Sequence, residues 1–420
     1  MTVKQKVKPT ARQLEYQAWE FGLFVHFGLR TFYEGYVDFD ERDMSPANFN
    51  PVNLDCSQWI ETAKEAGMEY AVLTAKHHDG FSNWPSKYTS FSVEKSPWKD
   101  GKGDVVQEFI TACRKNNIKP GLYYSPYDGA ADFYSNKDAK AYDDYFINQV
   151  TELLTNYGDI EIIWFDGAGS EGHKYDWDRI IPTIRSLQPN ILIFNMADPD
   201  FRWVGNEDGL APVPCWNVVS NLDFSIYIDE VEELEEPIWL PAECDVQMRT
   251  NWFYSENDEH TVKELEELMG IYYHSVGRGT NLLLNIGPNR EGLLPEKDKE
   301  RLLEFGAEIR KCFDKPVATI QQFELKDEEW IYKAKEPHLI DHLVIQEDLE
   351  NGESVQSFKI KILTVKTNRM LTIYEGQNIG NKAIIQIPPV KVRGVILEIT
   401  KTDGSPEIRE ISVYHVGQKL

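Results

Sequence analysis

One short stretch of the chain, E-I-I-W-F-D-G-A-G over residues 161–169, joins a strand to a carboxylate. Four consecutive apolar residues predict a strand buried on both faces, and Gly167 and Gly169 end it. Because side chains two apart share a strand face, Trp164 and Asp166 are expected to project together. The pattern predicts a carboxylate beside an indole at the C-terminal end of a strand, where α/β folds place catalytic groups. An aspartate that only opens a turn would give the same local sequence.

Other polar residues also fall at the ends of predicted strands. They are His26 in the segment 22–28, His77 and His78 after the strand 70–74, and Tyr123 and Tyr124 in the strand 119–124. A single histidine in an apolar strand is more often a satisfied core residue. Several such residues at one rim are hard to explain as packing, because the C-terminal rim of a barrel is where its site is built.

The elements that must position these residues alternate between strand and helix. Helices are expected over 57–66, 104–115, 139–156, 177–187, 262–276 and 296–312, and strands are expected to start at Leu23, Tyr70, Lys119, Glu161, Asn190, Ile238 and Asn281. One missed strand would complete an eight-fold barrel. Beyond Phe313 the runs are strand-like, with turns between them. The predicted fold class is α/β: a (β/α)8-like TIM barrel over 1–315, possibly irregular, followed by a C-terminal antiparallel β-sandwich over 316–420.

Composition narrows the choice of partner and compartment. The 420 residues carry 69 Asp and Glu against 44 Lys and Arg, a net charge of -25, which disfavours nucleic acid as a partner. The five cysteines form no C-x-x-C pair, so neither a zinc knuckle nor a disulfide framework is expected. No apolar run reaches the roughly 18 residues of a membrane span, and no signal peptide is evident. These features predict a soluble, cytoplasmic protein that does not contact membranes.

Two kinds of site compete for the rim residues. Metal-dependent barrel hydrolases need several ligands on one ion, typically with His-x-His on one strand, whereas the first strand here offers V-H-F. A neutral sugar fits better, because histidine and tyrosine can hydrogen-bond its hydroxyls while Trp164 covers an apolar face. We therefore favour a sugar pocket.

Cleavage of a glycosidic bond requires a second carboxyl group besides Asp166. Glu207, in the long irregular segment 196–237, and Glu243, at the expected end of the sixth strand, are both candidates. A loop position suits a proton donor that must reach a leaving group outside the pocket. From the residues alone, both glutamates remain open, and either could be a solvated surface acid.

Five motifs, F-G-L-F-V-H-F-G, T-A-K-H-H-D-G-F, G-L-Y-Y-S, I-W-F-D-G and N-L-L-L-N-I-G-P, occur in order between residues 20 and 311. Together they resemble the retaining α-L-fucosidases of glycoside hydrolase family 29. The resemblance implies a catalytic barrel with a β-sandwich, Asp166 as nucleophile and no metal or organic cofactor. It also implies fucose binding by a set of five residues: His26, His77, His78, Tyr123 and Trp164.

The resemblance gives Glu207 as the acid/base, since it matches the G-N-E pattern of the branch that prefers α-1,3/1,4-linked fucose; Glu243 stays in reserve. The implied substrate is a fucosylated glycan or glycoconjugate. Between Tyr33 and Met44 the sequence departs from the family, and a fucose contact there would have to come from Glu34, Asp38, Asp40 or Glu41. Two alternatives are a metal-dependent barrel hydrolase and a non-catalytic fucose-binding protein.

Overall fold

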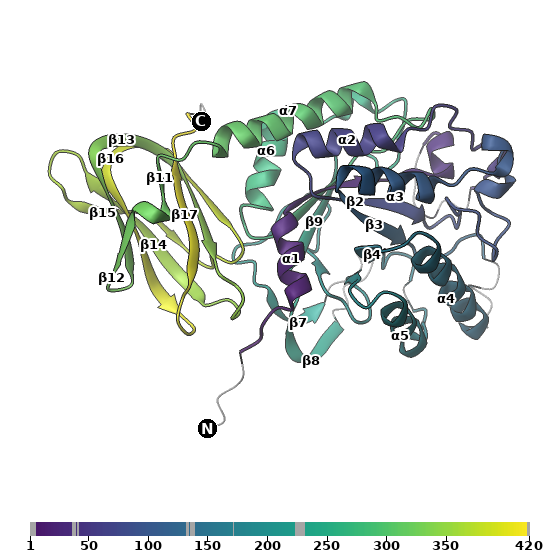
Figure 1. The fold of residues 1–420 in the computed structure, drawn as a ribbon, viewed down its shortest axis with the longest axis horizontal. Coiled ribbons are helices and arrows are strands. Elements are labelled where there is room, and N and C mark those ends of the chain that lie inside the picture. Colours follow the sequence, from purple (N-terminus) through teal and green to yellow (C-terminus); the bar gives the residue numbers. More distant parts are fainter. Residues whose placement is uncertain are drawn as a thin grey trace.

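The computed structural model describes residues 6–35, 39, 42–131, 134, 139–170, 172–222 and 232–417. It has two parts side by side, a barrel with surrounding helices and a C-terminal part made mainly of β-strands (Figure 1). The last barrel helix ends at Phe313 and the first strand of the C-terminal sheet begins at Ala318. The change from alternating strands and helices to strand-like runs, which the sequence shows after Phe313, thus coincides with the boundary between the two parts.

The barrel is an eight-stranded parallel sheet in the order β5-β4-β3-β2-β1-β10-β9-β6. A parallel bridge between Phe194 and Phe201 nearly closes it between β5 and β6. The strands are β1 (Phe21–Val25), β2 (Tyr70–Lys76), β3 (Lys119–Tyr124), β4 (Ile162–Phe165), β5 (Leu192–Phe194), β6 (Arg202–Trp203), β9 (Ala242–Gln247) and β10 (Asn281–Asn285). The predicted (β/α)8-like barrel is confirmed.

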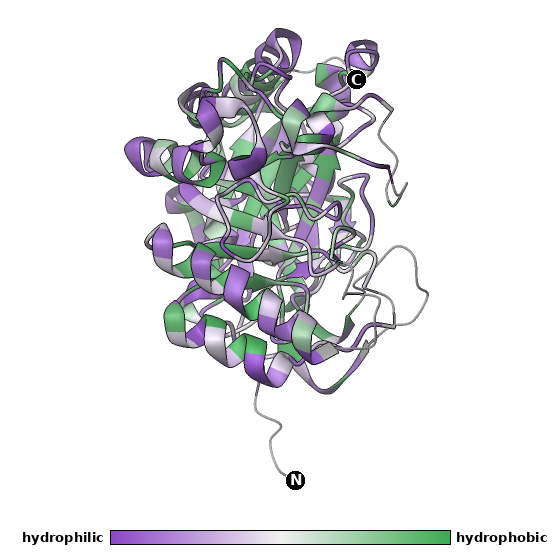
Figure 2. Cartoon of the chain, turned by 90° about the vertical axis from the view of Figure 1, so that its right-hand side faces the viewer, coloured by the Kyte–Doolittle hydropathy of each residue, from purple (hydrophilic) through white to green (hydrophobic). Residues whose placement is uncertain are grey.

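The strands are buried on both faces because helices cover the outside of the barrel. In Figure 2 the central strands are green, and the helices around them carry purple, hydrophilic segments. The helices are α1 (Ala11–Trp19), α2 (Cys56–Ala66), α3 (Val105–Asn116), α4 (Ala139–Asn156), α5 (Trp177–Leu187), α6 (Leu265–His274) and α7 (Glu296–Phe313). None of the helices among the described residues is long and apolar enough to cross a bilayer.

The strand predicted over 238–242 is wrong in its placement. Residues there end β8 (Glu232–Trp239), which pairs with β7 (Val218–Leu222) in a separate two-stranded sheet, and the barrel strand β9 begins at Ala242. The periodicity was misleading because β9 alternates polar residues, which face the barrel interior, with apolar ones. Helix α1 was not expected, and the segment 196–237 is not irregular throughout, since it contains β6, β7 and most of β8. Strand β6, with two residues, is too short to show any period.

The C-terminal part is an antiparallel sheet of seven strands, β11 (Ala318–Thr319), β12 (Phe323–Lys326), β13 (Glu329–Glu347), β14 (Val355–Thr364), β15 (Met370–Gly376), β16 (Ala383–Thr402) and β17 (Ile408–Tyr414). The long strands β13 and β16 change partners along their length, with register shifts near Lys333 and Ile340. They therefore take part in both halves of the sheet, which enclose one apolar core. This arrangement agrees with the predicted sandwich.

Helices α2 and α7 approach closely at Gly306. A Cβ atom at this position would lie 2.2 Å from the Ala66 carbonyl oxygen, which is backbone and cannot rotate away. Gly270, in the middle of α6, has no atom within 4 Å of the same position. Both glycines lie inside helices, but only Gly306 lacks the space for a Cβ atom.

We expect Gly306→Ala to lower the free energy of unfolding by about 1–3 kcal/mol, since overpacking outweighs the gain in helix propensity. Gly270→Ala, the matched control, should raise it by up to about 1 kcal/mol. Urea denaturation followed by circular dichroism measures both. Equal stability of the two variants would contradict the close packing of α2 on α7.

Candidate functional site

The predicted site residues come together at the C-terminal ends of four adjacent barrel strands. His26 follows β1, His77 and His78 follow β2, Tyr123 lies in β3, and Trp164 and Asp166 lie at the end of β4. The strands β1 to β4 are neighbours in the sheet, so their ends share one edge. All of these side chains are buried except Asp166, which is 25% exposed.

Asp166 is the centre of this cluster. The Tyr123 hydroxyl donates to Asp166 Oδ2 over 2.8 Å, His78 Nε2 lies 3.3 Å from the same oxygen, and the Ala168 N–H donates to Oδ1 over 2.9 Å. Burial alone would raise the pKa of Asp166, but His78 and these hydrogen bonds outweigh it and hold the pKa below its ordinary value. The carboxylate is therefore ionised and held from both oxygens.

Two of the histidines are oriented by partners on neighbouring segments. His78 Nδ1 lies 2.7 Å from Ser125 Oγ, which leaves Nε2 toward Asp166. His26 Nδ1 lies 2.7 Å from Asn285 Oδ1, on β10. Burial lowers the pKa of His26 to about 3, so this imidazole is neutral. With Nδ1–H donated to Asn285, the Nε2 of His26 is an acceptor for a ligand hydroxyl.

An aromatic column forms the floor of the site. Trp164 stacks on Phe194 with centroids 3.9 Å apart, Tyr123 stacks on Trp164 at 5.3 Å, and His77 stacks on Tyr123 at 5.3 Å. Such stacking restricts each ring to one plane. Tyr124, the neighbour of Tyr123, points outward and donates to Gln149 on α4, so only Tyr123 belongs to the site.

Glu243 lies beneath this column, and it is fully buried. Its Oε1 accepts the Trp164 indole N–H over 2.8 Å, and its Oε2 accepts the hydroxyls of Tyr16 and Tyr70, both over 2.7 Å. Burial raises the pKa of Glu243, against the effect of these three hydrogen bonds. Both oxygens are occupied deep inside the barrel, which favours a supporting role over proton transfer to a substrate.

Glu207 lies nearer the rim, in the segment that follows β6. It is half-buried, and its Oε2 is 3.5 Å from Nε2 of Gln247, the last residue of β9. Asp245, two residues earlier on the same face of β9, is buried and accepts the Trp203 indole N–H over 2.8 Å. Burial, and after it the charges of Glu207 and Glu243, raise the pKa of Asp245 well above its usual value. A perturbed carboxyl beside Glu207 is typical of a functional site.

Trp252 and Phe253 were missed by the sequence reasoning. The Trp252 ring lies 4.9 Å from that of His26, and the Phe253 ring lies edge-on, 5.0 Å from that of His77. Both rings thus pack directly beside the two histidines of the site. Their run W-F-Y would have been a signal had β9 been predicted to end at Gln247, because they would then follow a barrel strand.

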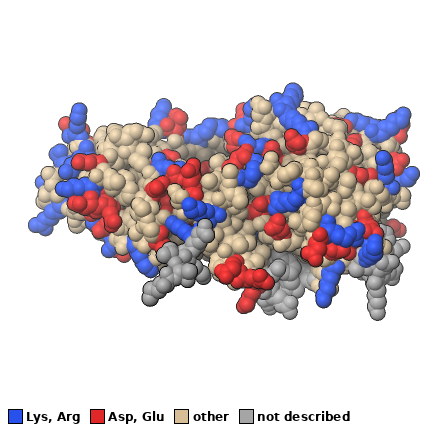
Figure 3. All heavy atoms as spheres, turned by 60° about the horizontal axis from the view of Figure 1, so that its bottom comes forward, with Lys and Arg blue, Asp and Glu red and all other residues tan. Residues whose placement is uncertain are grey.

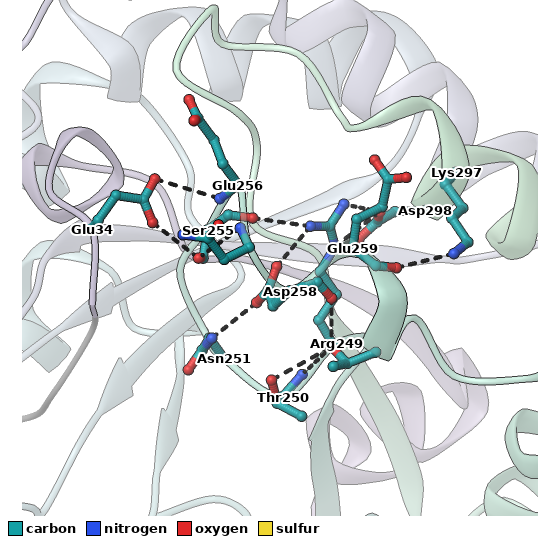
Figure 4. A network of polar contacts seen from close by, with 12 residues as sticks. Glu34, Arg249, Thr250, Asn251, Ser255, Glu256, Asp258, Glu259, Lys297 and Asp298 are labelled. Atoms are coloured by element: carbon teal, nitrogen blue, oxygen red, sulfur yellow. Dashed lines mark hydrogen bonds and ion pairs between the residues drawn. The ribbon is translucent and has the colours of Figure 1, made fainter.

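Of the four acidic candidates between Tyr33 and Met44, the structure describes one, Glu34. Asp38, Asp40 and Glu41 lie outside the described residues. Glu34 accepts hydrogen bonds from Ser255 Oγ over 3.0 Å and from Arg290 Nη2 over 2.5 Å (Figure 4 draws the contact with Ser255). Its carboxylate thus links the segment after β1 to the segments after β9 and β10.

Among the described residues, one group of side chains converges closely enough to hold a metal ion. His77, His78 and Asp166 each offer a ligand atom, and these atoms lie within 4.8 Å of one another. The direct contacts of Asp166 with His78 and Tyr123 already account for the geometry of the group. A chelator distinguishes a metal-dependent site from a metal-free one.

The contacts of Glu243 give a prediction about stability. Glu243→Ala would leave the indole of Trp164 and the hydroxyls of Tyr16 and Tyr70 without their acceptor. We expect a loss of at least about 3 kcal/mol in the free energy of unfolding, at roughly 1–3 kcal/mol for each orphaned donor. Glu243→Gln, which keeps one carbonyl oxygen, should cost less.

Glu207→Ala is the matched control, because this glutamate is half-buried; we expect a change of about 0.5 kcal/mol or less. Urea unfolding of the three variants against the unmodified protein measures these changes. Equal stability of Glu243→Ala and Glu207→Ala would show that the carboxylate inside the barrel does not anchor its three donors.

Comparisons with known proteins agree with the architecture. A family model described as alpha-L-fucosidase matches residues 2–311. Alpha-L-fucosidase 1 of Arabidopsis thaliana is 33% identical and covers 97% of this chain and 87% of its own length. A glycoside hydrolase 29 family member from a rumen bacterium superposes with a TM-score of 0.89 at 33% identity, covering 99% of this chain and 78% of its own. A Ruminococcus gnavus GH29 fucosidase in complex with fucose superposes with a TM-score of 0.83 at 27% identity. It covers 99% of this chain and 96% of its own length. The chain therefore belongs to the α-L-fucosidase family, glycoside hydrolase family 29, and is a glycoside hydrolase.

Proposed function

We propose that the chain is an exo-acting, retaining α-L-fucosidase that removes terminal α-L-fucosyl groups from glycans through a covalent intermediate. The observation that carries this proposal is the state of Asp166, an ionised and partly exposed carboxylate at the centre of the rim. A nucleophile in a retaining glycosidase must be ionised and must present an oxygen to the anomeric carbon. Its partners Tyr123, His78 and Ala168 hold Asp166 in that state.

The reaction follows in two steps. Asp166 forms a bond to the anomeric carbon while the bond from that carbon to the leaving oxygen breaks, and Glu207 gives its proton to the leaving oxygen. Water then attacks the fucosyl ester, Glu207 takes a proton from it, and Asp166 leaves as a carboxylate. The place of Glu207 near the rim, beside the end of β9, supports this assignment over the enclosed Glu243.

The surroundings of Asp166 suit a neutral sugar. Neutral His26 and the hydroxyl-bearing Tyr123 can supply hydrogen bonds. Trp164 is covered on both faces by Phe194 and Tyr123. The half-buried ring of Trp252 beside His26 therefore offers the apolar surface. His77 and His78 complete the set proposed to contact fucose. On the face of the described residues drawn in Figure 3, Lys and Arg lie interspersed with Asp and Glu, a surface that suits an uncharged ligand better than a polyanion.

The first test is hydrolysis of an aryl α-L-fucoside and of a panel of fucosylated oligosaccharides, in the presence of EDTA. We expect the unmodified protein to release fucose, Asp166→Asn to be inactive, and Asp159→Asn, an exposed aspartate used as control, to be unaffected. Glu207→Ala should lose most activity and recover it with azide, which replaces the water and needs no general base. From the G-N-E pattern we propose a preference for α-1,3/1,4-linked fucose.

Each failure has a distinct meaning. Inhibition by EDTA would favour a metal-dependent hydrolase. Full activity in Glu207→Ala would move the acid/base elsewhere. No release from any substrate by well-folded protein would contradict the proposed hydrolysis and favour a fucose-binding protein.

The hydrogen bond from Tyr123 predicts a change in pH dependence. It helps to lower the pKa of Asp166, so its removal in Tyr123→Phe should raise that pKa. Because only ionised Asp166 attacks, the acidic limb of kcat/KM should move to higher pH, by about one unit if the lost bond was worth about 1.4 kcal/mol.

Tyr124→Phe is the control, since Tyr124 faces α4 and should leave the limb in place. Profiles of kcat/KM against pH for the three proteins check the prediction. An unmoved limb in Tyr123→Phe, or an equal shift in Tyr124→Phe, would contradict it.

A further inference from the structure

An irregular segment, residues 248–264, lies between β9 and α6 and carries two aromatic rings that pack beside the site. Its regular structure is limited to a single 3-10 turn, Glu259–Thr261. Trp252 and Phe253 lie on this segment, next to the rings of His26 and His77. Since no strand or long helix fixes the segment, contacts of its own side chains and backbone must place the two aromatic rings.

Arg249 supplies the strongest of these contacts. Its guanidinium donates to Asp298 on α7 through Nε and Nη2, the shortest distance being 2.6 Å, and through Nη1 to Asp258 over 2.7 Å. Nη1 also donates to the Ser255 carbonyl over 3.2 Å. Arg249 and Asp258 are the two ends of the loop that bears Trp252 and Phe253, and Asn251 donates to Asp258 as well (Figure 4).

This ionic clamp, Arg249 with Asp258 and Asp298, is out of contact with bulk water. The three side chains are 5%, 7% and 1% exposed. A two-point guanidinium–carboxylate pair fixes orientation as well as distance, which a lysine does not reproduce. Breaking a buried pair leaves an uncompensated charge, so the clamp holds one geometry.

Other contacts fix the middle of the loop between the two residues that the clamp joins. The Asn285 side chain donates to the Trp252 carbonyl over 2.8 Å, and Asn285 also holds His26. A Cβ atom at Gly287 would lie 2.6 Å from the Tyr254 nitrogen, so the loop packs backbone to backbone on the segment after β10. The outer contacts of Glu34 and Arg290 are exposed and therefore weaker.

We propose that Arg249 is a positioning residue of the sugar site: through Asp258 and Asp298 it holds Trp252 and Phe253 as a preformed wall beside His26 and His77. The proposal rests on the fucosidase function proposed above. It assigns to Arg249 an effect on sugar affinity, although its guanidinium is buried and donates to Asp258, Asp298 and the Ser255 carbonyl. The consequence is a change in KM and ligand affinity, with a smaller change in kcat.

The test measures binding of a fucose-configured iminosugar by calorimetry, together with KM and kcat for an aryl α-L-fucoside. In Arg249→Lys we expect binding to weaken and KM to rise about 10-fold, with kcat within about 3-fold of its original value. Arg310→Lys is the control, because Arg310 lies on α7, as Asp298 does, but donates to the Glu65 carbonyl on α2 and not to the segment 248–264. This control should change neither the affinity for the iminosugar nor KM by more than about 2-fold.

A double-mutant cycle separates positioning from general destabilisation. If Arg249 acts through the aromatic wall, Arg249→Lys should weaken binding by no more than about 2-fold when Trp252→Ala is already present. Asp258→Asn, which keeps the pair of Arg249 with Asp298, gives a second and milder variant. It should shift affinity in the same direction even if Arg249→Lys does not fold.

Three results would decide between this proposal and the function on which it depends. Unchanged affinity in folded Arg249→Lys and Asp258→Asn, or an undiminished effect in the Trp252→Ala background, would overturn the role of Arg249 alone. Binding of the iminosugar without turnover by the unmodified protein would overturn the hydrolysis alone. Absence of binding by the folded, unmodified protein would overturn both.

Discussion

A single carboxylate inside the barrel connects four separate parts of the chain. Glu243 on β9 accepts hydrogen bonds from Tyr16 on α1, Tyr70 on β2 and Trp164 on β4. A buried carboxylate is costly unless its oxygens are satisfied, so the three donors and the acceptor require one another. Trp164 in turn sets the plane on which Tyr123 stacks, and Tyr123 holds Asp166. The geometry at the rim therefore begins at the bottom of the barrel.

Burial acts with opposite consequences on the groups of the site. It keeps His26 neutral and raises the pKa of Asp245 and Glu243, while Asp166 stays ionised because His78, Tyr123 and a backbone N–H outweigh the burial. The pKa values of carboxyl groups are thus shifted in opposite directions within one barrel. The proposed mechanism needs this separation, because it requires an ionised carboxylate as the nucleophile and a second carboxyl group as the proton donor.

The sequence predicted the part of the fold whose residues follow simple periods. Helices 139–156 and 177–187 were placed at their observed bounds, and the rim residues from His26 to Asp166 lie where their strands end. Strand β9 was misplaced because Glu243 and Asp245 alternate with Cys244 and Val246, a pattern typical of a half-exposed strand. Here the polar side faces a barrel interior that contains tyrosine and tryptophan donors. That compensation depends on residues far away in the chain and cannot be recognised locally. The same error concealed Trp252 and Phe253, and the role of Arg249 depends on Asp298, which belongs to another element.

The pairing of His26 with Asn285 joins the first barrel strand to the last one, across 259 positions of sequence. Most of the rim residues precede residue 170, yet the imidazole of His26 takes up its final orientation only when β10 has closed against β1. Contacts between such distant residues form late, because the intervening chain must first lose its freedom. During synthesis, a nascent chain that already contains Asp166 therefore has no complete sugar pocket, and a sugar ligand can stabilise this fold only after the ring of strands is closed.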